Sequence, residues 1–408
     1  MISVEEAQKI ILSEIRRLGT ERVPLSQSLG RILSEEVSSP LDHPPWDTSA
    51  MDGYAVRWSD TAGASRATSR RLKIIEEIPA GTLPQKKVQP GEASKIMTGA
   101  PLPEGADAVV KVEETERHGD QVQIFEAAEE GDFIRKKGEA LRTGDLLLKK
   151  GIRIRPADIA MMASIGKSIV PVYQQPRVAI LSTGDELADL DEARGPNKIL
   201  NSNGYGLAAQ VIEAGGVPIV LGIARDTRED LSAKLRQGLH ADFLLASGGV
   251  SMGDYDFVQD VLIELGAEMK FWKVAMKPGQ PLAFGVIAGK PAFGLPGNPV
   301  SAMVSFEQFV RPALLKTGGR EEIFRPILHA TLEEEVRKHP GKRHFMRAIV
   351  SVQNGEYRVR TTGDQDSHIL FSLVKANALM ILSEEGDRVK AGERVPVQLL
   401  SDLTVPSH

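Results

Sequence analysis

The sequence predicts a multidomain protein in which an α/β domain is combined with two β-rich parts. From Arg177 to about Lys316, short apolar runs alternate with segments of helical periodicity. Strands separated by about 10 to 15 helical residues are typical of βαβ units, whose parallel sheet is covered by helices on both faces. Residues 50–145 and the chain after about 325 instead contain short alternating stretches separated by Gly, Pro, Asn and Asp, which predict β-structure. The length of 408 residues is enough for roughly two to four domains.

The amino-terminal segment predicts an amphipathic helix that packs on the protein. Ser3 and Glu6 have the spacing of a capping box, and apolar residues from Val4 to Leu18 recur at helical spacing. Prolines at 40, 44 and 45 then interrupt regular structure. The segment 171–176, with a proline at each end, predicts a linker and a domain boundary near 176.

These patterns divide the chain into four regions. Residues 1–45 and 146–175 form a linker domain, and residues 46–145 form a β-rich insertion domain. Residues 176–325 form a three-layer α/β/α domain with a parallel sheet. Residues 326–408 are expected to form a C-terminal β-barrel, with a β-sandwich as the alternative.

The composition restricts the class of partner. Fifty Lys and Arg residues are interspersed with 55 Asp and Glu residues, giving a net charge of −5, and only 5% of residues are aromatic. A basic face and stacking aromatic residues are what nucleic acids require, so no nucleic-acid partner is expected. The absence of cysteine excludes disulfides and thiolate ligands and leaves oxygen donors for a metal. Without a signal-peptide pattern or a long apolar run, a cytoplasmic protein with no membrane partner is expected.

A glycine-rich loop follows one of the predicted strands. Residues 247–253 come directly after the apolar run 243–246, where a buried strand would end. Glycines let the backbone approach a ligand closely, and free amides in such a loop favour an anion. The loop therefore predicts a phosphate site.

Three acidic residues also follow predicted strands, and they suggest a cation at the same edge of the sheet. Glu186, Asp226 and Asp256 would lie where hard carboxylates, phosphate oxygens and water could complete the shell of a Mg²⁺ ion. The alternative is helix capping, because Asp226 with Glu229 and Asp256 with Gln259 have capping-box spacing. Spacing alone favours the capping interpretation.

Two lysines and a proline-bracketed helix start complete the candidate site. Lys273 and Lys277 could each balance a phosphate or an oxyanion, although a solvated surface lysine is the commoner case. In the segment 294–301, Asn298 can cap a helix and Pro299 suits its first turn, so amides would face an anion. The loops 47–54 and 96–101 also look functional, but simple turns explain them equally well.

Six motifs together resemble one known family. They are residues 49–55, 97–101, 182–187, 247–256, 277–279 and 295–301. In the same order along the whole chain, they are similar to the molybdopterin molybdenumtransferase family (MoeA), which includes the E domain of gephyrin. The resemblance implies an elongated homodimer with a pterin-binding α/β/α domain. It also implies Mg²⁺-dependent cleavage of adenylylated molybdopterin, entry of molybdate as substrate, and release of AMP.

The resemblance also assigns roles to individual residues. It implies catalytic roles for Asp52, Thr98, Glu186, Lys273 and Lys277, and metal binding by Asp226 and Asp256. The implied substrate-binding residues are Ser182, Thr183, Gly184, Ser247, Gly248, Gly249, Ser251, Pro296, Gly297, Asn298, Pro299, Arg347 and Ser367.

Two departures and two alternatives accompany the resemblance. Gln280 stands where many relatives have a lysine, and Ala140 where they often have an aspartate, so lower activity, a tungstate preference or a specialised paralogue would be possible outcomes. A molybdopterin adenylyltransferase is one alternative function, since its relatives share the α/β motifs, and such an enzyme is also a possible partner. A non-catalytic scaffold like gephyrin is the other.

Overall fold

The computed structural model describes residues 1–192, 195–249 and 257–401. The chain forms two compact units, and each is described by itself. The main unit comprises Met1–Glu35, Gly151–Pro156 and Ile169–His408. The insertion unit comprises Glu36–Lys150 and Ala157–Ser168. The division into four domains made from the sequence stays a prediction.

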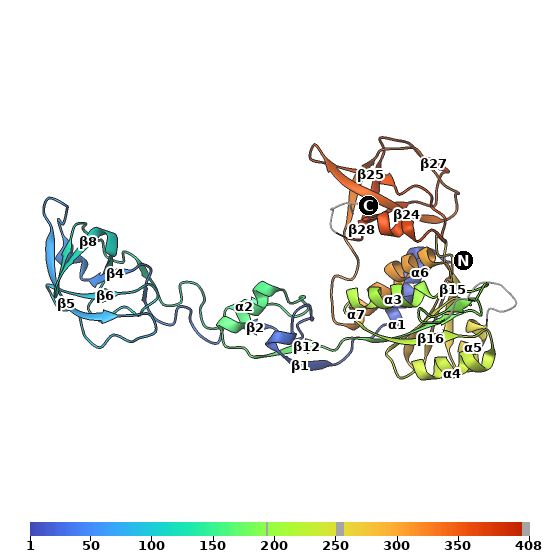
Figure 1. The fold of residues 1–408 in the computed structure, drawn as a ribbon, viewed down its shortest axis with the longest axis horizontal. Helices are drawn as coiled ribbons and strands as arrows, with labels where there is room; N and C mark the ends of the chain where they lie inside the picture. Colours follow the sequence, from blue (N-terminus) through green and yellow to red (C-terminus); the bar gives the residue numbers. More distant parts are fainter. Residues whose placement is uncertain (193–194, 250–256, 402–408) are drawn as a thin grey trace. The chain divides into compact units, whose positions relative to one another are not determined.

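The insertion unit, which contains the strands labelled β4, β5, β6 and β8 in Figure 1, is built on a six-stranded sheet with the order β7-β4-β6-β5-β9-β8. Alternate residues of β4 pack on opposite faces, Tyr54 and Val56 in one core cluster and Ala55 in another, as the period of a strand requires. Its strands are β4 (Gly53–Val56), β5 (Arg70–Ile78), β6 (Glu92–Ile96), β7 (Ala108–Lys111), β8 (Thr115–His118) and β9 (Gln121–Ile124). Shorter pieces of the unit are β2 (Val37–Ser38), β3 (Thr48–Ser49), β10 (Ile134–Arg135), β11 (Leu146–Leu148) and most of helix α2 (Pro156–Ser164).

The sheet of the main unit has the strand order β16-β13-β17-β21-β20-β18. The first four of these strands are mutually parallel, as the sequence predicts, but β20 runs antiparallel to β21 and β18. The reason is a tight hairpin, because only Ala288 and Gly289 connect β20 to β21 and both have positive φ. The strands are β13 (Arg177–Thr183), β16 (Val217–Ala224), β17 (Phe243–Ser247), β18 (Glu268–Lys273), β20 (Pro281–Ile287) and β21 (Lys290–Leu295).

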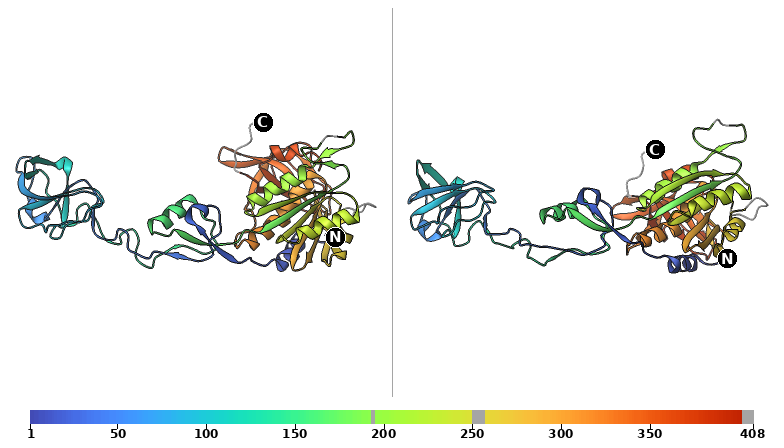
Figure 2. Two further views of the ribbon diagram at one scale, coloured as in Figure 1. Left: turned by 60° about the horizontal axis from the view of Figure 1, so that its bottom comes forward. Right: turned by 90° about the horizontal axis from the view of Figure 1, so that it is seen from below.

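Helices cover both faces of this sheet, which gives the predicted three layers (Figure 2). Val178 and Ile180 of β13 pack in the core with α1, α3, α6 and α7, whereas Ala179 and Leu181 pack in the core with α4 and α5. The helices are α1 (Val4–Glu14), α3 (Ser202–Glu213), α4 (Arg228–Gly238), α5 (Val258–Glu264), α6 (Pro299–Ser305) and α7 (Arg311–Thr317). A π-helical turn, η4 (Phe306–Val310), joins α6 to α7.

The amino-terminal prediction is confirmed, and the linker predicted at 171–176 is wrong for residues 171–173, which are in a strand. The Ser3 hydroxyl accepts from the Glu6 amide at 3.1 Å and caps α1. Residues 169–173 form β12 (Ile169–Tyr173), which pairs antiparallel with β1 (Thr20–Pro24). Prolines are tolerated there because β12 belongs to a two-stranded sheet, where half of the backbone amides have no ladder partner to lose.

The C-terminal part of the main unit is a closed barrel, as predicted. Its strands follow the order β24-β25-β22-β28-β26, and β26 pairs back with β24. The strands are β22 (Ile327–Leu332), β24 (Arg343–Gln353), β25 (Glu356–Thr361), β26 (Ala378–Leu382) and β28 (Arg394–Leu399). The short strand β19 (Met276–Lys277) from the α/β part pairs parallel with β24. This pairing ties the barrel to the segment that carries Lys277.

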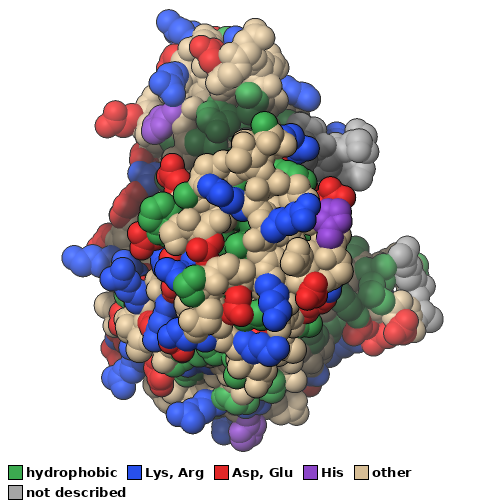
Figure 3. All heavy atoms as spheres, turned by 90° about the vertical axis from the view of Figure 1, so that its left-hand side faces the viewer, with side chains coloured by type: hydrophobic (Ala, Val, Ile, Leu, Met, Phe, Trp, Pro, Cys, Tyr) green, Lys and Arg blue, Asp and Glu red, His purple; other side chains and the backbone are tan. Residues whose placement is uncertain are grey.

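The surface and the helix lengths add two observations. On the face shown in Figure 3, Lys and Arg side chains are intermixed with Asp and Glu side chains. Among the described residues, every helix is too short or too polar to cross a lipid bilayer.

Candidate functional site

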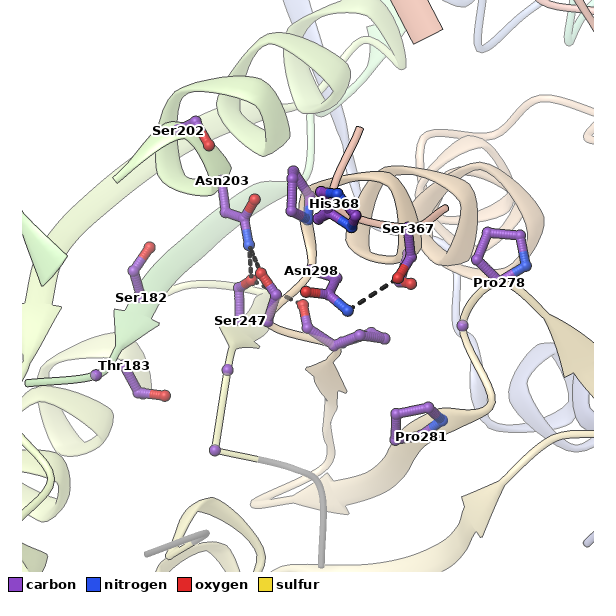
Figure 4. A pocket seen from close by; sticks show the side chains of 18 of the residues that line it. Ser182, Thr183, Ser202, Asn203, Ser247, Pro278, Pro281, Asn298, Ser367 and His368 are labelled. Atoms are coloured by element: carbon purple, nitrogen blue, oxygen red, sulfur yellow. Dashed lines mark hydrogen bonds between the residues drawn. The ribbon is translucent and has the colours of Figure 1, made fainter. Parts of the chain in front are cut away.

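A cavity of about 920 Å³ opens in the main unit where the parallel strands end (Figure 4). Its wall is made by loops at the carboxyl ends of β13, β17 and β21, by the segment before β20, and by the barrel loop 365–368. Ligands of open α/β sheets bind at this edge, because the loops of neighbouring strands converge there. The cavity brings together most of the residues singled out from the sequence. Those that line it are Ser182, Thr183, Gly184, Glu186, Asp226, Ser247, Gly248, Gly249, Lys277, Pro296, Gly297, Asn298, Pro299 and Ser367.

Glycine at position 248 is required by a close approach to the neighbouring loop. Gly248 has a φ of +95°, and a Cβ there would lie 2.6 Å from the Thr183 carbonyl oxygen. The Thr183 hydroxyl is buried and has no hydrogen-bond partner among the described residues. Leaving a buried hydroxyl without a partner costs free energy. The Thr183 hydroxyl could therefore donate a hydrogen bond to a ligand bound in this loop.

Two asparagines at the amino end of α3 make hydrogen bonds to residues at or just after the carboxyl ends of β13, β17 and β21. The Ser182 hydroxyl donates to Asn201 Oδ1 at 2.8 Å, and that oxygen also accepts from the Gly204 amide. Asn203 Nδ2 donates to the Ser247 hydroxyl at 2.9 Å and to the Gly297 carbonyl at 2.7 Å, as Figure 4 shows for its contact with Ser247. These bonds hold three loops together before any ligand arrives.

Asn298 occupies the predicted cap position but uses its side chain elsewhere. It is the N-cap residue of α6 and makes no capping hydrogen bond, while Pro299 begins the helix. Its Nδ2 donates instead to the Ser367 hydroxyl at 2.9 Å, and the Ser367 carbonyl accepts from the Val300 amide at 3.2 Å. The barrel loop is therefore fastened over the cavity by this turn.

The acidic side of the cavity lies at the ends of β13 and β16. The Asp185 amide donates to Asp226 Oδ2 at 3.1 Å, and the Asp226 amide donates to Asp185 Oδ1 at 3.3 Å. The N-cap of α4 is Thr227, whose hydroxyl accepts from the Asp230 amide. The capping interpretation of Asp226 is therefore wrong, and Asp226 lines the cavity together with Glu186.

The basic side of the cavity contains Lys277, whereas Lys273 lies outside the lining. Lys277 is exposed and follows the barrel-paired Met276, and no hydrogen bond or ion pair involves its ammonium group among the described residues. Lys273 ends β18 at the edge of the sheet. The structure thus separates two lysines that the sequence could not distinguish.

Arg347 is fully buried behind the cavity wall. Its exposure is 1%, its Nε donates to the Ser372 hydroxyl at 3.0 Å, and its Nη2 donates to the Asp366 carbonyl at 3.2 Å. Burial lowers the pKa of Arg347 to about 10, which still leaves a cation at neutral pH. Arg347 lines a second, smaller cavity that shares Lys277, Pro278 and Gln365 with the first.

Asp52 and Thr98 belong to the insertion unit and contact each other. Asp52 Oδ1 accepts from the Thr98 amide at 2.7 Å and from the Thr98 hydroxyl at 2.8 Å. These two hydrogen bonds favour the charged carboxylate and hold the pKa of Asp52 below its ordinary value of 3.8. The charged carboxylate of Asp52 is therefore held in place at the end of the β-rich sheet where β4 begins and β6 ends.

This geometry predicts how Asp52 titrates. Because its folded pKa is lowered, Asp52 stabilises the fold fully above pH 3.8 and loses that contribution as the pH falls through the lower folded value. Thr98→Val removes the hydroxyl donor and should move the pKa toward 3.8 without reaching it, since the amide bond remains. A carboxyl-carbon NMR titration measures this, and identical curves for both proteins would contradict it.

Several lining residues were not found from the sequence. They are Asn201, Ser202, Asn203, Lys342, Gln365, Asp366 and His368, whereas Gln280 and Ser301, which also line the cavity, belong to segments noted in the sequence. The asparagines had a usable signal, because they start a predicted helix directly after a strand region. The barrel residues had none, since their approach to the cavity depends on the closure of the barrel.

Two predicted residues, Ser251 and Asp256, lie outside the described residues. Among the described ranges, no group of three or more His, Asp or Glu side chains is arranged to hold a metal ion. Of the three predicted acidic residues, Glu186 and Asp226 line the cavity, and Asp366 of the barrel loop lines it as well. The predicted magnesium site therefore stays a prediction.

Comparison with known proteins covers the whole chain. Three family models match in the expected order: the MoeA N-terminal region at residues 2–166, a probable molybdopterin binding domain at 179–316, and the MoeA C-terminal region at 329–400. A molybdopterin molybdenumtransferase of Nostoc sp. is 38% identical over 97% of this chain and 93% of its own length. The chain belongs to the MoeA family. A second family member, molybdopterin molybdenumtransferase 2 of Mycobacterium tuberculosis, is 40% identical over 97% of this chain and 99% of its own length.

A solved MoeA structure has the same fold. The crystal structure of a molybdopterin biosynthesis MoeA protein from Pyrococcus horikoshii superimposes with a TM-score of 0.85 at 36% identity, covering 98% of this chain and 99% of the other. The resemblance inferred from six short motifs is therefore confirmed over the full length. The MoeA assignment also fits a cavity whose two sides carry opposite charges.

Proposed function

We propose that this chain is a molybdopterin molybdenumtransferase that inserts molybdate into adenylylated molybdopterin and releases AMP. The observation that carries the proposal is one cavity with Glu186 and Asp226 at one end and Lys277 at the other, where the Lys277 ammonium makes no ion pair or hydrogen bond with any described residue; Asp366 of the barrel loop also lines the cavity. Glu186 and Asp226 follow β13 and β16, whereas Lys277 precedes β20. A substrate with a phosphoanhydride and a second, oxyanionic reactant needs such separated charges.

The separation follows from the strand order. Strands β17 and β21 lie between β13 and β20, so the two ends of the cavity are roughly 14 Å apart at about 4.8 Å per strand. At that distance Glu186 and Asp226 do not neutralise Lys277, because the Debye screening length in salt is shorter, about 8 to 10 Å. Each end can therefore bind its own charged group.

The carboxylate end fits a magnesium ion. Glu186 and Asp226 supply hard oxygen donors on adjacent loops, and Mg²⁺ is ordinarily held by one or two carboxylates with water and substrate phosphate oxygens. Asp256 would join them. When bound, the ion would polarise the phosphoanhydride. The residues of the chain would orient the substrate: the Thr183 hydroxyl and the loop at Gly248 would hold phosphate oxygens, and Lys277 would hold the oxyanion.

The experiment that tests this function is incubation of the purified protein with adenylylated molybdopterin, molybdate and Mg²⁺, following AMP and molybdenum cofactor together. Both products should form in equal amounts, and a chelator should stop both. Asp226→Asn should lower the rate strongly while leaving the thermal unfolding midpoint unchanged. If the protein made adenylylated molybdopterin from ATP and could not consume it, the proposal would fail.

Features beyond the α/β part favour this function over the alternatives. An adenylyltransferase would need only the α/β segment, yet the relatives named molybdopterin molybdenumtransferase match this chain at both ends as well. A scaffold would have no use for Glu186, Asp226 and Lys277 in one cavity. A molybdopterin adenylyltransferase remains the proposed upstream partner.

We further propose a cytoplasmic homodimer. Helix α3 exposes Tyr205 at 48% and Ile212 at 62%, seven residues apart and so on one helical face. Large exposed apolar side chains on one face are typical of a subunit interface. Sedimentation of the wild type and of Ile212→Glu tests this, since only a dimer that uses α3 would dissociate in the variant.

A further inference from the structure

Lys342 reaches the cavity from the barrel and was not among the residues found from the sequence. It immediately precedes β24, is half-buried, and lines the cavity. Its ammonium donates a hydrogen bond to Oε1 of Gln280, which lies on the opposite segment before β20. A cation from the barrel segment is thus placed beside Gln280 of the α/β part.

The charge of Lys342 is not neutralised by the chain. Among the described residues, no carboxylate forms an ion pair with Lys342, and the bond to the neutral Gln280 amide uses only one of the three donors of the ammonium. A partly desolvated ammonium without a counter-charge is costly. Its remaining donors are therefore free for an anion that enters the cavity.

The backbone on both sides of this contact is fixed. The Arg343 amide donates to the Ala275 carbonyl at 2.9 Å, and the Arg343 side chain makes ion pairs with Glu5 and Glu384. On the other side, the Gln280 carbonyl accepts from the Val274 amide at 3.1 Å. The backbone that carries Lys342 and Gln280 is therefore already ordered before a ligand binds. Such preorganisation reduces the entropy lost on binding and strengthens electrostatic binding.

We propose that Lys342, oriented by Gln280, is an anion-binding residue that holds a doubly charged tetrahedral oxyanion together with Lys277. This inference rests on the proposed function and adds a specific residue to it. Molybdate and the phosphate monoester that the pterin carries once AMP has left share the required chemistry. Gln280 is a positioning residue, because its Oε1 accepts a hydrogen bond from the Lys342 ammonium and so orients that group.

The test is calorimetric binding of molybdate, and separately of inorganic phosphate, to the full-length protein. Lys342→Met should bind the relevant anion about 10- to 100-fold more weakly, since a charge-assisted hydrogen bond is lost. Lys342→Arg should retain most of the affinity, and Gln280→Leu should weaken it about threefold to tenfold because the ammonium is no longer oriented. The exposed lysine variant Lys9→Met is the control.

A charge exchange gives a sharper readout than loss of function. The double variant Gln280→Lys with Lys342→Gln moves the ammonium to the opposite segment and should recover affinity that Lys342→Met loses. In turnover, Lys342→Met should raise the KM for molybdate more than it lowers kcat, which a merely structural role would not produce.

The outcomes separate this inference from the proposed function. Loss of molybdate affinity alone assigns Lys342 to the molybdate end, and loss of phosphate affinity alone assigns it to the pterin phosphate. Unchanged affinity for both anions in Lys342→Met overturns the inference, even if the wild type turns over normally. A wild type that makes no cofactor overturns the proposed function, whatever its affinity for anions.

Discussion

Lys277→Met is expected to lower the rate of cofactor formation by about 100- to 1000-fold, the cost of removing a preorganised charge from a developing anionic transition state. Lys277 lines the cavity, and no described residue neutralises its ammonium. The side chain is exposed, so the thermal unfolding midpoint should not change. Rates of AMP and cofactor release measure the effect, and Lys277→Arg should recover part of the lost rate because the charge remains.

Lys273→Met is the informative comparison. Lys273 ends an edge strand and is not part of the cavity lining, so its loss is expected to lower the rate by less than about tenfold. An equal loss of rate in Lys273→Met and Lys277→Met would show that lining the described cavity does not decide which lysine takes part in the reaction. Retention of more than a tenth of the rate in Lys277→Met would remove the role assigned to it.

Glu307→Leu is expected to destabilise the main unit by about 3 to 5 kcal/mol, because Arg325 loses its buried counter-charge and keeps only the exposed partner Glu213. Glu307 is 5% exposed, and its Oε1 accepts from Arg325 Nε at 2.7 Å and from Gln398 Nε2 at 3.1 Å. Gln398 belongs to the barrel strand β28, so this network joins the α/β part to the barrel. Burial raises the pKa of Glu307 despite the neighbouring Arg325 and Arg311.

A matched control exists for this prediction. Glu213 also pairs with Arg325, at 2.8 Å, but its side chain is 60% exposed. Glu213→Gln should therefore change stability by less than about 1 kcal/mol, the usual value of an exposed ion pair. Urea unfolding measures both variants. A similar small loss in Glu307→Leu would contradict the buried-pair argument.

The elements that the sequence predicted well are those determined by local patterns. The apolar runs at 178–181 and 243–246 became β13 and β17, and the periodic segments near 203–214 and 228–238 became α3 and α4 within one residue or so. The capping box at Ser3 was equally local. The glycine-rich loop and the acidic residues after strands were found because parallel strands end at one edge of a sheet.

The elements that it missed depend on contacts between distant segments. Residues 171–173 pair with β1, more than a hundred residues earlier in the chain. For Asp226, spacing alone favours a helix cap over a metal ligand, but the neighbouring Thr227 takes the cap position. Asn298 was expected to cap α6, but its side chain bonds to Ser367 of the barrel.

By itself, the sequence determined the three-layer domain, the barrel, the family and most of the cavity wall, because strand and helix periodicity and short loop motifs depend on neighbouring residues. Only the tertiary structure decided which charged residues share the cavity. Lys277 was distinguished from Lys273, and Lys342 was added, by the pairing of β19 with β24. That pairing joins residues about 70 positions apart, and no local pattern encodes a contact between segments that meet only after the barrel has closed.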